Sequence, residues 1–96
     1  MESNDKYAML LTQLVLMLQA AAMQHLGKLK QPGAEAIERN LEAARSVIDM
    51  IDMINVKTAG NLSDEEKRLV RQVLQDLQLN YVDEVQKDQK EAGTPQ

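Results

Sequence analysis

The sequence predicts an all-α protein, a bundle of three long antiparallel helices that is completed by oligomerisation. Apolar residues recur every three or four positions through three long stretches, and no stretch alternates with the period of a strand. Apolar residues make up 44% of the 96-residue chain, yet it contains two Tyr, no Phe and no Trp, so the core must be aliphatic, which suits packing between helices. We expect helices over about 4–27, 34–59 and 64–89 in a single domain over 1–90, followed by a flexible tail over 91–96.

Composition and charge exclude several function classes. The net charge is −4, and the 11 basic residues are scattered among 15 acidic ones, which disfavours a nucleic-acid partner. With no Cys and one His, neither a thiolate nucleophile nor a Cys-based zinc site can form, and we expect no cofactor. The stretch 1–6 carries more acid than base, unlike a secretory signal, so the expected location is the cytoplasm.

The stretch from Tyr7 to Gly27 contains no charged residue, which raises the question of a membrane span. Polar side chains interrupt the stretch at a density that is costly in hydrocarbon. They are Thr12, Gln13, Gln19, Gln24 and His25. A helix of a water-soluble bundle explains the pattern better, and we do not expect a membrane span.

This helix has two apolar faces. At 100° per residue the main face contains Tyr7, Leu10, Leu11, Leu14, Val15, Leu18, Ala21, Ala22, His25 and Leu26. We expect Leu18 at the centre of the core. On another side, Met9, Leu16 and Met23 repeat every seven residues. Either the other two helices cover this second edge or another copy of the chain does; we prefer the second interpretation.

The second helix follows a break at Gly27 and Pro32-Gly33, which we interpret as a short turn between antiparallel neighbours. Glu35 and Arg39 have the favourable order for an ion pair one turn apart. The apolar stripe comprises Ile37, Leu41, Ala44, Val47, Ile48, Ile51 and Ile54. Outside it lie Met50 and Met53, which we add to the candidate interface residues.

A hinge joins the second and third helices. Gly60 supplies the left-handed backbone that commonly ends a helix, and Ser63 with Glu66 is typical of a capping box. Lys57 and Asn61 suit a helix C-terminus and a turn. The buried stripe of the third helix comprises Leu69, Val70, Val73, Leu74, Leu77, Tyr81 and Val85.

Several positions together resemble a bacterial family described as domain of unknown function 1844. They are Asn40-Leu41, Ala44-Arg45, Ile48-Asp49, Lys57-Thr58, Gly60-Asn61-Leu62, Glu65-Glu66, Leu69, Leu77 and Tyr81-Val82, with His25-Leu26-Gly27 and Pro32-Gly33 before them. The resemblance covers about residues 14–85, and the Lys-Thr-x-Gly-Asn-Leu hinge is its most specific part. It implies a small bacterial helical protein without an assigned activity, so it identifies no catalytic residue.

Three side chains could carry chemistry. His25 could bind metal or act as a base, but nothing in the sequence supplies a second positioned group, and a hydrogen-bonded histidine at a helix end explains it better. Asp49 and Asp52 resemble a solvated helix flank rather than an acid–base pair. We expect Arg45 to form an ion pair with the acidic start of the third helix or with a partner.

These observations lead to one preferred function and one alternative. The preferred function is a non-enzymatic module for protein–protein interaction that self-associates through the first helix and could also bind another protein. The alternative is a metal- or small-ligand-binding helical protein whose site lies at an oligomer interface, with His25 and carboxylates of neighbouring chains as ligands.

Overall fold

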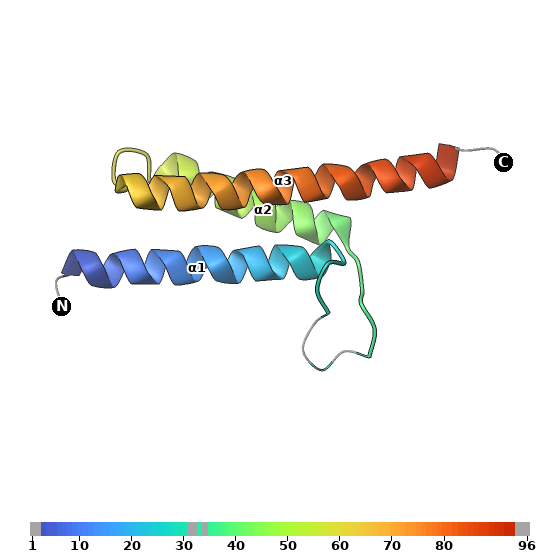
Figure 1. The fold of residues 1–96 in the computed structure, drawn as a ribbon, viewed down its shortest axis with the longest axis horizontal. Helices are drawn as coiled ribbons and strands as arrows, with labels where there is room; N and C mark the ends of the chain where they lie inside the picture. Colours follow the sequence, from blue (N-terminus) through green and yellow to red (C-terminus); the bar gives the residue numbers. More distant parts are fainter. Residues whose placement is uncertain (1–2, 31–32, 34, 94–96) are drawn as a thin grey trace.

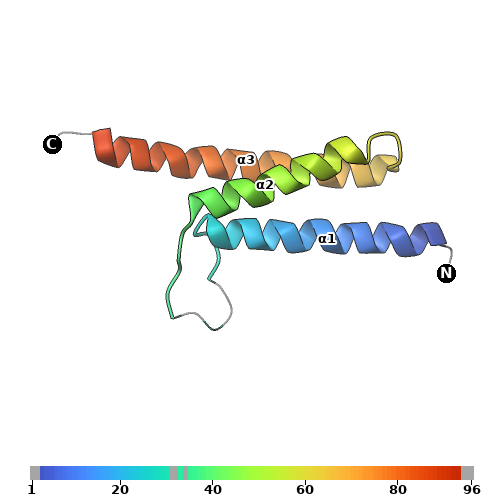
Figure 2. The same cartoon turned by 180° about the vertical axis from the view of Figure 1, so that it is seen from behind.

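The computed structural model describes residues 3–30, 33 and 35–93 and consists of three packed helices. They are α1 (Ser3–His25), α2 (Leu41–Lys57) and α3 (Asp64–Gly93). Each helix contacts the other two. Figure 1 shows that α1 and α3 run in one direction while α2 runs back behind α3, and Figure 2 shows α2 from the other side, where it passes in front of α3. The expected all-α fold, with antiparallel consecutive helices, is confirmed.

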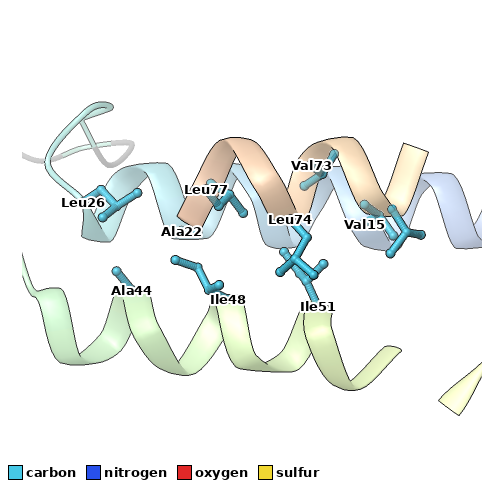
Figure 3. Packing of buried hydrophobic residues seen from close by; sticks show 10 residues of the cluster. Val15, Ala22, Leu26, Ala44, Ile48, Ile51, Val73, Leu74 and Leu77 are labelled. Atoms are coloured by element: carbon cyan, nitrogen blue, oxygen red, sulfur yellow. The ribbon is translucent and has the colours of Figure 1, made fainter. Parts of the chain in front are cut away.

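The core lies where the three helices cross. Its ten buried apolar residues are Val15, Ala22, Leu26, Ala44, Ile48, Ile51, Val70, Val73, Leu74 and Leu77. Figure 3 shows Ala22 and Ala44 at the end of the cluster beside Leu26, where small side chains allow close approach. Leu18 packs against the edge of the core and is only partly buried, so the expectation that it lies at the centre is wrong.

The connection between α1 and α2 is longer than predicted. The second helix begins at Leu41 rather than residue 34, because the side chain of Asn40 accepts a hydrogen bond from the Ala43 amide at 3.0 Å and caps the helix there. The Asn40 amide donates to the His25 carbonyl at 2.7 Å, so one hydrogen bond ties the two ends of the connection together. Ile37 is therefore exposed instead of belonging to the buried stripe of α2.

The hinge between α2 and α3 has the predicted form. Gly60 has φ of +87°, and the amide of Ser63 donates to Glu66 Oε1 at 2.8 Å while the amide of Glu66 donates to Ser63 Oγ at 3.2 Å. These reciprocal bonds make the expected capping box. The Thr58 hydroxyl donates to the Ile54 carbonyl at 2.6 Å, and the Asn61 amide donates to the Thr58 carbonyl, so backbone and hydroxyl groups end α2.

We expect Gly60→Val to lower the free energy of unfolding by about 1–2 kcal/mol, because a β-branched residue resists a positive φ. A Cβ at Gly60 would meet no atom within 4 Å, so the backbone conformation alone carries the cost. Gly60→Asn is the matched control, since Asn tolerates this conformation better. Urea denaturation followed by circular dichroism compares the three proteins; equal midpoints for Val and Asn would contradict the explanation.

The molecule is elongated and flat. Its extents are 60 × 31 × 16 Å and its radius of gyration is 15.9 Å, whereas a compact domain of this length has about 12.5 Å. The third helix continues to Gly93 instead of ending near residue 89, so positions 91–93 of the expected tail are helical. Positions 94–96 lie outside the described residues.

Candidate functional site

The first helix presents two apolar strips to solvent, one on each side of the residues that face the core. The strip formed by Tyr7, Leu10, Leu14 and Met17, called here the tyrosine strip, has exposed fractions of 44–68%. Three of its members belong to the predicted main face, but the structure leaves them outside the core. That face is broader than the area that α2 and α3 cover, because α2 begins near the C-terminal end of α1 and then slopes away from it (Figure 1).

The second strip is the edge singled out from the sequence, formed by Met9, Leu16 and Met23 and called here the methionine strip. Met9 and Leu16 are about half exposed, while Met23 packs against the core. The other two helices therefore cover one end of this strip and leave two of its residues open. Met50 and Met53, on α2, are also about half exposed.

The exposed character of α1 extends over most of its length. The stretch Asp5–His25 is long and apolar enough, by length and composition, to cross a membrane, and 11% of it is buried within the protein. A core helix of a soluble protein is mostly buried, so α1 differs from one in how little of it the rest of the chain covers.

A cluster of ion pairs holds the α1–α2 connection against α3. The buried carboxylate of Glu84 receives hydrogen bonds or ion pairs from three cations: Lys87 Nζ at 2.8 Å, Lys28 Nζ at 2.9 Å and Arg39 Nη1 at 2.9 Å. Arg39 also pairs with Asp88 Oδ1 at 2.5 Å. Two of these cations, Lys28 and Arg39, come from the two sides of the connection, so Glu84 joins both sides to α3.

The cluster determines the ionisation of its members. Hydrogen bonds from Lys87 and Lys28 lower the pKa of Glu84 to about 2 despite burial, which acts in the opposite direction. Hydrogen bonding to Asp88 and then to Glu84 raises the pKa of Arg39, and Glu84 likewise raises the pKa of Lys87. Glu84, Arg39 and Lys87 are thus held in their charged forms, which suits a structural clamp rather than proton transfer.

Sequence reasoning missed this cluster, although one signal was present. Glu84 lies on the same face of α3 as Leu77 and Tyr81, at steps of four and three residues, and a carboxylate on a buried stripe requires charged partners. The sequence also predicted the wrong ion-pair partner for Arg39, which was expected to pair with Glu35 inside a longer second helix. Arg39 instead precedes α2 and reaches α3.

Residues 8–84 match the family model described as domain of unknown function (DUF1844). The chain belongs to the DUF1844 family. The match includes the hinge and most of the first helix, and it confirms the resemblance inferred from the sequence. No curated protein and no solved structure matches the chain.

The other candidate residues of this DUF1844 protein are spread over its surface. His25 is the last residue of α1, and its carbonyl accepts the Asn40 amide. The described residues contain no group of three His, Asp or Glu side chains placed to hold a metal ion. Within the same part of the chain, Arg45 forms no ion pair with the start of α3; it lines an open polar hollow of about 680 Å³ together with Asp49 and Tyr81.

Proposed function

We propose that this DUF1844 protein is a non-enzymatic interaction module that self-associates through the uncovered apolar surface of α1. The observation that carries the proposal is the amount of large apolar side chain left in water. Among the described residues, six of the thirteen exposed large hydrophobic side chains belong to this one helix. These six residues are Tyr7, Met9, Leu10, Leu14, Leu16 and Met17. Large exposed apolar surfaces usually mark interaction sites.

The total surface area supports a second copy as the occupant. The chain exposes 7023 Å², whereas a compact monomer of the same mass, 10.8 kDa, exposes about 5,500 Å². A stable interface removes roughly 800 Å² from each partner. The surplus of roughly 1,500 Å² is therefore large enough to supply such an interface, even though the connection and the far end of α3 contribute part of it.

The charged groups support a non-enzymatic role. Arg39, Glu84 and Lys87, whose pKa values are shifted, all belong to the clamp that holds the connection on α3. Their side-chain hydrogen bonds join them to one another and to Asp88. We propose that the protein acts in the cytoplasm and that another protein could bind the same surface. The excess of acidic over basic residues disfavours a nucleic-acid partner.

Sedimentation velocity from low to high micromolar concentration tests the proposal. We expect a dimer or larger species whose fraction grows with concentration, because apolar burial drives the association. A monodisperse monomer throughout the range would contradict self-association. Cosedimentation with anionic lipid vesicles, run in parallel, tests the competing explanation that the apolar surface of α1 binds a membrane. A monomeric protein that sediments with the vesicles would support that explanation instead.

A further inference from the structure

We infer that self-association is a two-fold antiparallel pairing of α1 with α1 of a second copy, and that the tyrosine strip forms the seam. This inference rests on the proposed function and specifies which of the two apolar strips meets the partner, and in which direction. It uses three observations: the spacing of the strip, the state of the competing strip, and the position of the α1–α2 connection.

The spacing of the tyrosine strip makes it self-complementary. From Tyr7 the strip advances in steps of three, four and three residues, which is the spacing of the seam in a two-helix coiled coil. The order of steps is the same when read backwards. In an antiparallel pair, Leu10 of each chain therefore lies opposite Leu14 of the other, and Tyr7 lies opposite Met17. The four residues span about 15 Å of helix, with one seam residue at nearly every turn.

The methionine strip is a weaker seam. Its members are seven residues apart, so it offers one apolar residue for every two turns. Between them stand Thr12, Gln13 and Gln19, whose polar groups would lose water on contact. Met23 already packs against the core of its own chain. This strip therefore has two residues available where the tyrosine strip has four, and they are spaced at half the density.

The antiparallel direction follows from how the chain leaves α1. Figure 1 and Figure 2 show the described residues of the connection, 26–30, 33 and 35–40, at the C-terminal end of α1, while residues 7–17 lie toward the opposite end. Antiparallel pairing places the two connections at opposite ends of the seam, whereas parallel pairing sets them beside each other. It also brings the positive end of each helix dipole toward the negative end of its partner's.

The matched variants Leu14→Glu and Leu16→Glu test the choice of strip. Both positions are leucines on the same helix with nearly equal exposed fractions, 44% and 45%, so the two variants differ chiefly in the strip they interrupt. In sedimentation velocity we expect Leu14→Glu to be a monomer at concentrations where Leu16→Glu and the unaltered protein are dimers. Circular dichroism verifies that both variants retain their helix content.

The outcomes separate this inference from the proposed function. Dissociation by Leu16→Glu but not by Leu14→Glu would overturn the choice of strip while self-association stands. Dissociation by neither variant would also overturn it. A monomeric unaltered protein would overturn both the inference and the proposed function.

Cysteine cross-linking tests the direction and remains decisive if Leu14→Glu fails to fold. The chain has no Cys, so any disulfide must form at the introduced thiols. Leu10→Cys carrying an affinity tag is mixed with untagged Leu14→Cys and oxidised. We expect the mixed, singly tagged disulfide to dominate. Dominance of the two like-with-like products would show parallel pairing and overturn the antiparallel arrangement, and absence of any disulfide in a dimeric sample would overturn the seam.

Discussion

Leu77→Ala is expected to lower the free energy of unfolding by about 2–5 kcal/mol, the range for removing a large buried aliphatic side chain and leaving a cavity. Leu77 is completely buried, and Figure 3 shows it among the core residues that α1 and α2 contribute. The loss is a large part of the roughly 5–15 kcal/mol that stabilises a typical domain. Few alternative packings can fill the space, because all three helices contribute to the cluster.

Leu18→Ala provides the matched comparison for this prediction. The Leu18→Ala substitution removes the same number of atoms, but from the edge of the core, where the side chain is partly exposed. Its loss in the free energy of unfolding should therefore be clearly smaller. Urea denaturation followed by circular dichroism measures both. All samples must have the same protein concentration, because the proposed self-association would add concentration-dependent stability. Equal losses for the two variants would show that Leu77 is not the more deeply packed residue.

Glu84→Gln is expected to lower the free energy of unfolding by about 1–3 kcal/mol at neutral pH, because it removes the buried charge that Lys28, Arg39 and Lys87 share. Asp83→Asn is the control. The Asp83 carboxylate is half exposed and reaches Lys28 and Lys87 at 3.7 and 3.5 Å, so its loss should change stability by less than about 0.5 kcal/mol. Similar effects of the two substitutions would contradict the central role of Glu84.

The effect of Glu84 should also depend on pH. Its pKa is lowered in the folded protein, from 4.5 to about 2, so the folded state favours the ionised carboxylate. The stabilisation is complete above the unfolded pKa and disappears as the pH falls toward the folded one. We therefore expect the difference between the unaltered protein and Glu84→Gln to shrink between about pH 5 and pH 2. Denaturation curves at several pH values measure it, and a constant difference would exclude a charge-based effect.

Local patterns were sufficient to predict the helices and the hinge. The capping box at Ser63 and Glu66 and the positive φ at Gly60 depend on residues close together in the chain, so the sequence contains all the information needed. The start of α2 was missed because it depends on a distant contact. Residues 34–39 include good helix formers, but Arg39 is bound to α3 and Asn40 caps the helix after it.

The candidate interface was only partly predictable, for a related reason. Periodicity identifies an apolar face but does not tell whether that face meets the same chain or another one. Tyr7, Leu10 and Leu14 follow the spacing of a core stripe, but α2 slopes away from α1 and these side chains are exposed. Only the arrangement of the helices separates these residues from Val15 and Ala22 on the same helix.

The bond between the Asn40 amide and the His25 carbonyl has a practical consequence for engineering this protein. It closes the base of the segment between α1 and α2, and the Glu84 clamp anchors both of its sides. Extra residues inserted after Gly33, which is exposed, would lengthen the segment without pulling the two helices apart, since loop length adds only slowly to the entropy of closure. This position is accordingly a suitable place for a reporter or an affinity handle that must leave α1 accessible.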